Sequence, residues 1–179
     1  TLDNAATIQS DVGTLTLGAG GIAGATQNLT VEGLGDTTIN GVIGTTTGTL
    51  TKNDAGTLTL SGTNTYTGDT TINAGILNIQ NAQGTGTAAG GVTVADGAVL
   101  EIQGDIAVGA ETLNIQGTGI VTNGAVRNIS GTNSWAGVIT LDNAATIQSD
   151  AGTTLTLGAG GIAGATQNLT VEGLGDTTI

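Results

Sequence analysis

The stretch that decides the fold covers residues 48–79 and reads GTLTKNDAGTLTLSGTNTYTGDTTINAGILNI. Apolar residues alternate with threonine or asparagine at residues 58–60 (LTL) and 77–79 (LNI). A period of two residues over such short runs predicts β-strands with one buried face. Gly, Asn, Asp and Thr separate the runs and favour turns. The stretch therefore predicts short strands that are joined by tight corners.

The same alternation continues outside this stretch, at residues 15–17, 29–31, 92–94, 100–102 and 113–115. The run at 77 follows the run at 58 by 19 residues, and the run at 100 follows by a further 23, which is the length of one solenoid turn. The long strands and Asn-Gly hairpins of a sandwich are missing. The pattern predicts an all-β fold, a right-handed parallel β-helix (β-solenoid) with about 20 residues per coil. Leu, Ile and Val should point inward, and the intervening Thr and Asn should face solvent or line the corners.

Internal repetition extends over the whole chain. The segment TLDNAATIQSD at residue 1 recurs at residue 140, and residues 14–39 recur from residue 154 after one inserted threonine. The period is about 140 residues. We expect one continuous solenoid over residues 1–179, in which Thr1–Ile139 form one unit and Thr140–Ile179 begin the next. The absence of methionine predicts that the chain is an internal slice of a longer protein.

A fainter repeat divides this unit in half. Residues 61–68 (SGTNTYTG) are matched by residues 130–137 (SGTNSWAG), and Tyr and Trp, the only aromatic residues, occupy the same place in the two motifs. We expect the motif to build equivalent corners, flanked by inward-facing strand residues. The predicted structural residues are Leu58, Leu60, Gly62, Asn64, Tyr66, Gly68, Leu77, Ile79, Asn133, Trp135 and Gly137.

Residues 50–52 (LTK), 56–62 (GTLTLSG), 64–68 (NTYTG) and 75–79 (GILNI) follow one another in the order of a known motif. The stretch resembles the passenger-associated strand repeat of bacterial autotransporters. Residues 130–147 resemble it loosely, with Trp135 in place of the tyrosine. The resemblance implies a β-helical stalk at the cell surface or beyond it. It also implies that the repeat is a scaffold and that other parts of the parent protein carry the distinguishing activity.

Composition excludes several classes of partner and site. Lys and Arg number 2 against 14 Asp and Glu, so the net charge is −12, and we expect no binding to nucleic acid or anionic membranes. Cysteine and histidine are absent, which removes disulfides and the common soft metal ligands. Each apolar run is too short to span a bilayer.

The sequence predicts no cofactor site and no catalytic site. Residues 18–23 (GAGGIA) fit a dinucleotide-binding fingerprint, but a strand pattern follows where a helix is required, so we expect a corner. Glu101 and Asp105 could form the carboxylate pair of a polysaccharide-cleaving β-helix, with Arg127 as a cation. Gly104 predicts a corner between the two acids, and aromatic sugar subsites are missing. We therefore expect the chain not to be an enzyme.

The acidic residues and the remaining polar residues fit corner positions better than metal sites. Residues 33–36 and 68–69 come nearest to a calcium-binding nonapeptide but lack its tandem spacing, so we expect corner aspartates, with calcium as the alternative. Lys52, close to Asp54, should neutralise an aspartate or cap a corner. Three Asn-x-Thr/Ser patterns begin at Asn28, Asn128 and Asn168, and they predict a hydrogen-bonded ladder of corner asparagines more than glycosylation.

These observations favour a structural or adhesive rod, a segment of a large repetitive extracellular bacterial surface protein with further copies of the unit along the chain. One alternative is an extracellular fibre or matrix filament that assembles from stacked solenoids. Another is a face of regularly spaced hydroxyl groups, as at residues 57–59, that meets a glycan or another repetitive surface. A polysaccharide-acting enzyme is the least favoured alternative.

Overall fold

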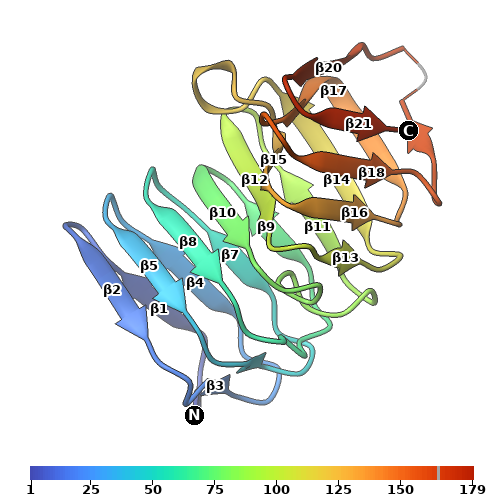
Figure 1. The fold of residues 1–179 in the computed structure, drawn as a ribbon. Coiled ribbons are helices and arrows are strands. Elements are labelled where there is room, and N and C mark those ends of the chain that lie inside the picture. Colours follow the sequence, from blue (N-terminus) through green and yellow to red (C-terminus); the bar gives the residue numbers. More distant parts are fainter. Residues whose placement is uncertain (165) are drawn as a thin grey trace.

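A computed structural model describes residues 1–164 and 166–179 and shows a stack of β-strand coils (Figure 1). Strands pair in parallel with strands of the neighbouring coils, as Leu58 of one coil does with Leu77 of the next. The coils hold about 22 residues each and make about 8 turns. The predicted β-solenoid is confirmed, with coils slightly longer than the expected 20 residues.

Successive strands of a coil lie on three faces, which we number in chain order. Face 1 contains β1 (Ala6–Gln9), β4 (Leu29–Glu32), β7 (Leu50–Lys52), β9 (Thr70–Ile72), β11 (Gly91–Val94), β14 (Thr112–Gly117), the first part of β17 (Ile139–Ser149) and β19 (Ile162–Ala163). Face 2 contains β2 (Thr14–Leu17), β5 (Asp36–Ile39), β8 (Thr57–Leu60), β10 (Gly75–Ile79), β12 (Ala98–Gln103), β15 (Val126–Ser130), the last part of β17 and β20 (Leu169–Gly173). Face 3 contains two smaller sheets, of β3 (Ile22–Ala23) with β6 (Ile43–Gly44), and of β13 (Ala107–Val108), β16 (Thr132–Trp135), β18 (Thr154–Leu157) and β21 (Asp176–Thr178).

Helical structure in the described residues is confined to one 3₁₀ turn, η1 (Ile120–Thr122), between β14 and β15. Nothing helical there has the length and apolar character of a membrane-spanning segment.

Aliphatic columns fill the interior, as the alternation predicts. On face 2, Leu58 pairs with Leu77 and Leu77 with Leu100, so the spacings of 19 and 23 residues are indeed successive coils. All three side chains are fully buried. Each coil thus covers the apolar row of its neighbour, which is how a solenoid removes apolar surface from water without a globular core.

Two strand threonines contradict the expectation that threonines face outward. Thr37 lies in the face 2 column, paired with Leu15 and Leu58, and Thr70 lies in the face 1 column, paired with Leu50. Both are buried. The cause is strand parity, because the runs DTTI and TTI place one of their two threonines in register with the inward leucines of the next coil.

The long repeat does not contain a whole number of coils. Six successive pairings on face 1 lead from Ile8 to Leu141, and the copy of Ile8, Ile147, then lies on face 2. The pairing inside the copies is retained, since Ile8 pairs with Val31 and Ile147 with Val171. One unit therefore spans six coils and one additional face. Every element of the second copy is displaced by one face from its counterpart in the first.

Candidate functional site: two aromatic corners and the buried chain between them

The two SGTN motifs build equivalent corners through their asparagines. Asn64 Oδ1 accepts a hydrogen bond from the Ile43 amide at 2.9 Å, and Asn133 Oδ1 accepts one from the Ile106 amide at 2.7 Å. In both cases the donor belongs to the preceding coil, and both asparagines are buried. A buried backbone N–H needs a partner, so each asparagine satisfies a group that the strand pairing leaves open.

The motif glycines allow the coils to approach closely. A Cβ atom added to Gly68 would overlap the carbonyl oxygen of Gly48, and one added to Gly137 would overlap that of Glu111. The earlier glycines of the motif differ: Gly62 is stacked on Gly41, whereas Gly131 adopts a φ of 82°, in the left-handed region. The corners are therefore alike at their last glycine but not at their first.

The aromatic side chains fill the interior behind these corners. Tyr66 and Trp135 are the largest fully buried side chains of the protein's described residues. The predicted strand residues beside them, Leu58, Leu60, Leu77 and Ile79, are buried as well. The motif therefore supplies packing and corner geometry, and its side chains line no open site.

A chain of buried hydrogen bonds links one aromatic corner to the other. The Tyr66 hydroxyl lies 2.6 Å from Thr70 Oγ1, which donates to the Thr85 carbonyl at 3.0 Å. The Thr85 hydroxyl donates to Glu111 Oε2 at 2.6 Å, and Trp135 Nε1 donates to the Glu111 carbonyl at 2.8 Å. Because a threonine hydroxyl has one proton and that of Thr70 goes to Thr85, Tyr66 is the donor in the first bond.

Glu111 stands out in this chain because its carboxyl group is buried, with 2% of the residue exposed. Its Oε1 atom has no hydrogen-bond partner among the described residues. Burial raises the pKa of Glu111 to about 7, although the hydrogen bond from Thr85 lowers it. Burial likewise raises the pKa of Tyr66 above its usual range, and the negative charge of Glu111 adds to this effect.

Lys52 is a second buried ionisable residue, located in the interior column between Val31 and Ile72. Its Nζ donates to the carbonyl oxygens of Asp54, at 2.7 Å, and Ala74, at 3.3 Å, as well as to that of Asn53. Burial lowers its pKa to about 8. Lys52 thus caps a corner, one of the two roles expected for it.

The candidate catalytic residues do not form a shared site. Gly104, with φ of 95°, makes the expected corner between the two acids. Glu101 Oε1 lies 3.6 Å from an Arg127 nitrogen, whereas Asp105 Oδ1 accepts the Thr132 amide at 2.7 Å. Arg127 also binds both carboxylate oxygens of Asp150. These groups join neighbouring coils to one another.

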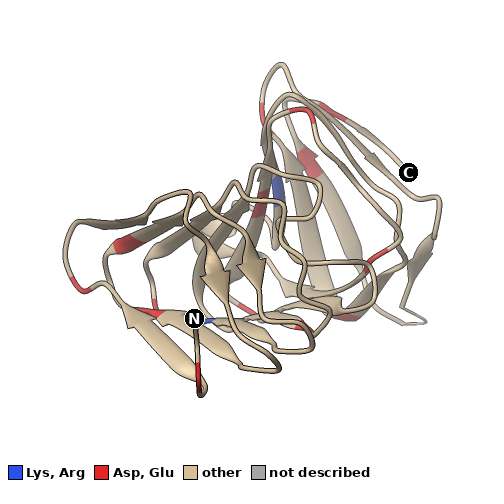
Figure 2. Cartoon of the chain, turned by 90° about the horizontal axis from the view of Figure 1, so that it is seen from below, with Lys and Arg blue, Asp and Glu red and all other residues tan. Residues whose placement is uncertain are grey.

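Acidic residues are spread along strands and turns instead of forming one cluster (Figure 2). At the two positions weighed for calcium, Asp36 Oδ1 accepts the Thr57 amide at 2.9 Å and Asp69 Oδ1 accepts the Gly91 amide at 3.0 Å. No three metal-ligating side chains gather anywhere in residues 1–164 or 166–179.

The asparagines of the glycosylation patterns differ in their contacts. Asn28 Oδ1 accepts the Thr49 amide at 3.1 Å, and the buried Asn128 accepts a bond from Asn133. Asn168 contributes its backbone carbonyl to the Ala145 amide. Of the dinucleotide-like residues 18–23, the first four form a turn and the last two are β3, which is the corner expected from the sequence.

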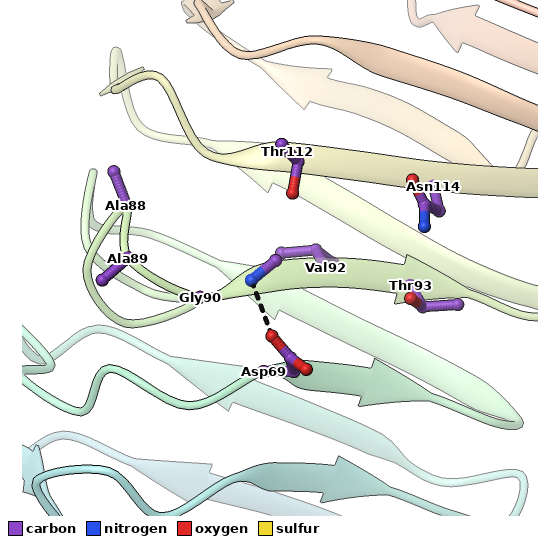
Figure 3. Close-up of a pocket in the computed structure, with 9 residues that line it drawn as sticks. Asp69, Ala88, Ala89, Gly90, Val92, Thr93, Thr112 and Asn114 are labelled. Atoms are coloured by element: carbon purple, nitrogen blue, oxygen red, sulfur yellow. Dashed lines mark hydrogen bonds between the residues drawn. The ribbon is translucent and has the colours of Figure 1, made fainter.

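An open groove of about 310 Å³ lies on the outer side of face 1 (Figure 3). Its polar lining comes from Asp69, Thr93, Thr112 and Asn114. The groove lies at the end of a row of outward, half-buried threonines, in which Thr30, Thr51, Thr71 and Thr93 pair in register. A second row, of Thr16, Thr38 and Thr59, pairs in register on face 2, which is where the hydroxyl pattern of residues 57–59 lies.

Comparison with known families agrees with the position of the aromatic corner. A family model described as the passenger-associated-transport-repeat matches residues 50–79, the strands β7 to β10 with the corner of Tyr66. This confirms the resemblance identified over residues 48–79. No curated protein and no solved structure matches the chain. The family implies a surface or secreted location, and the chain is thus a β-solenoid that contains this repeat and fits an autotransporter passenger segment.

Proposed function

We propose that this segment is a stalk, which holds other parts of a large surface protein away from a bacterial cell. The proposal rests on the solenoid fold, the duplicated unit and the passenger-associated repeat. With coils spaced by roughly 4.8 Å, each added unit would lengthen the rod by about 30 Å. Length is then the property that the repeat controls.

One observation carries the proposal: the side chains that could perform chemistry are used to bind adjacent coils. Four aspartate carboxylates accept a backbone N–H from another coil, namely Asp36, Asp54, Asp69 and Asp105. The two cations also join coils, because Lys52 Nζ donates to the Ala74 carbonyl and Arg127 donates to the Asp150 carboxylate. Such use of charged groups supports a scaffold more than an enzyme.

The threonine row of face 1 favours a second candidate, an adhesive rod. Its hydroxyl groups recur once per coil and are accompanied by the amides of Asn53 and Asn73, which bond to each other at 2.9 Å. A polymer with many hydroxyl groups, such as a glycan, could meet this row with hydrogen bonds. The row contains no aromatic residue, so sugar stacking would contribute nothing to binding.

The stalk and the adhesive rod can be separated in the complete surface protein on its cell. We expect deletion of one 139-residue unit to weaken attachment, and an unrelated solenoid of equal length to restore it, because a stalk supplies only reach. A triple variant, Thr30→Val, Thr51→Val and Thr71→Val, removes three hydroxyls while it keeps strand propensity. It should attach normally.

Loss of attachment by the triple variant, with normal display at the surface, would overturn the stalk in favour of the adhesive row. Electron microscopy of the purified protein tests the remaining alternative, because filaments much longer than one chain would indicate self-assembly. The charge of −12 should keep rods apart at low ionic strength, so filaments should also be sought in high salt and with divalent cations.

A further inference from the structure

The carboxyl group of Glu111 is enclosed where several coils converge. Thr85, in the coil before it, donates to Oε2, and Trp135, in the coil after it, donates to the backbone carbonyl. Thr85 is itself tied through its carbonyl to Thr70, and so to Tyr66. A change in the volume or solvation of this carboxyl group therefore acts on four coils at once.

The surroundings of Glu111 contain no compensating positive charge. Both ion pairs in the described part of the chain belong to Arg127. The carboxyl group is bound by the Thr85 hydroxyl and interacts electrostatically with the phenol of Tyr66, and both of these groups are uncharged at neutral pH. An ionised Glu111 would leave a negatively charged Oε1 buried without a donor, whereas the protonated acid buries only a neutral hydroxyl.

We propose that Glu111 is a proton latch on this corner: protonation of its carboxyl group keeps the coils closed, and loss of the proton to solvent loosens them. The carboxyl group provides the only proton that moves, and no other bond changes. The folded chain holds this proton up to a pH of about 7, whereas the ordinary glutamate value is 4.5. Stability from the latch is therefore complete below about pH 4.5 and is lost as the pH rises through 7.

Few other side chains would obscure this transition, because the chain has no histidine and no cysteine, and the lowered pKa of Lys52, about 8, lies at the upper edge of the pH range. Between pH 5 and pH 8, a pKa raised to about 7 should lower the ratio of closed to open corner on the order of a hundredfold. This change can be measured at single amides.

Amide hydrogen exchange reports the opening directly. The Thr87 amide, bound to the Tyr66 carbonyl at 3.0 Å, lies beside the latch, and the Leu29 amide, bound to the Thr49 carbonyl, lies in a coil outside the four that these hydrogen bonds join. After correction for base catalysis, we expect the protection of Thr87 to fall about a hundredfold from pH 5 to pH 8 and that of Leu29 to stay constant. In Glu111→Gln, which keeps every other titrating group, Thr87 should show no such fall.

An equal fall in the Gln variant, or no fall in the unaltered chain, would overturn the latch. Should Glu111→Gln fail to fold, carboxyl-carbon NMR of the unaltered chain decides the matter. Glu111 should then titrate near pH 7, and a midpoint near 4.5 would refute the proposal. Thr85→Val removes the hydrogen bond that lowers the pKa, so it should move this midpoint to higher pH, whereas a merely structural role of Thr85 would leave the midpoint in place.

Discussion

The two copies of the long repeat have nearly the same sequence but bury different residues. Leu155 is fully buried, whereas its counterpart Leu15 is 39% exposed. The order is reversed further along, since Val31 is 1% exposed and Val171 is 41% exposed. Strand β18 with Leu155 pairs on both sides, with β16 and β21, while β2 with Leu15 pairs with β5 alone. Leu15 lies in the first described coil and Val171 in the last, so within the described residues the difference comes from the presence or absence of a neighbouring coil, because the local sequences are the same.

The largest expected effect comes from the leucine pair. Leu155→Ala should lower the local free energy of unfolding by about 2–5 kcal/mol, because it leaves a cavity between two coils. Leu15→Ala should cost less than about 1 kcal/mol, since water already reaches this side chain. Hydrogen exchange at the amides of β16 and β18, compared with those of β2 and β5, measures both losses. Equal losses of stability in the two variants would mean that the exposed side of the coil with Leu15 is covered in solution.

A reversed result is expected for the valine pair. Val31→Ala removes two methyl groups from a column that is covered on both sides, and we expect a loss of about 1–3 kcal/mol. Val171→Ala should change stability by less than about 1 kcal/mol. Because the first copy is now the sensitive one, denaturant unfolding of the four variants together distinguishes neighbour effects from a generally weaker copy. If the same copy lost more stability in both the leucine pair and the valine pair, the role assigned to neighbouring coils would be wrong.

The smallest effect concerns an aspartate that has a cationic partner in only one copy. Asp150 accepts two hydrogen bonds from Arg127, at 3.0 and 2.8 Å, whereas Asp11 accepts one from Gln9 at 2.9 Å. Asp150→Asn should cost about 1 kcal/mol, with a smaller cost in high salt, because the pair is partly exposed. Asp11→Asn should be neutral within about 0.5 kcal/mol at either salt concentration. If the loss of stability in Asp150→Asn did not depend on salt, it would come from packing and not from the ion pair.

Strand parity explains which features could be predicted. The inward residues Leu58, Leu60, Leu77 and Ile79 and the coil spacing follow from alternation alone. The same parity places Lys52 in line with Leu50, so its burial could have been read from the sequence. Thr37 and Thr70 were missed because a run of two threonines does not reveal which of them points inward.

Glu111 could not be predicted in this way. It stands directly before a strand, in a position that resembles other corner acids, and its burial results from coils far apart in the sequence. The displacement of the second copy by one face could not be predicted from the sequence either, because the number of residues per coil varies. Partner residues are 19 apart for Leu58 and Leu77 but 26 apart for Leu100 and Val126. A period of about 140 residues therefore cannot be divided into coils without the pairing.

Each unit contains six coils and one extra face, which has a consequence for any rod built from successive identical units. Each unit would be rotated about the rod axis by one third of a turn relative to the unit before it. A flat partner lying along one side would meet a given surface only at every third unit, roughly 90 Å apart for a coil spacing of 4.8 Å. Identical units would in this way present the same surface in three directions around the rod. The number of residues per coil sets this rotation.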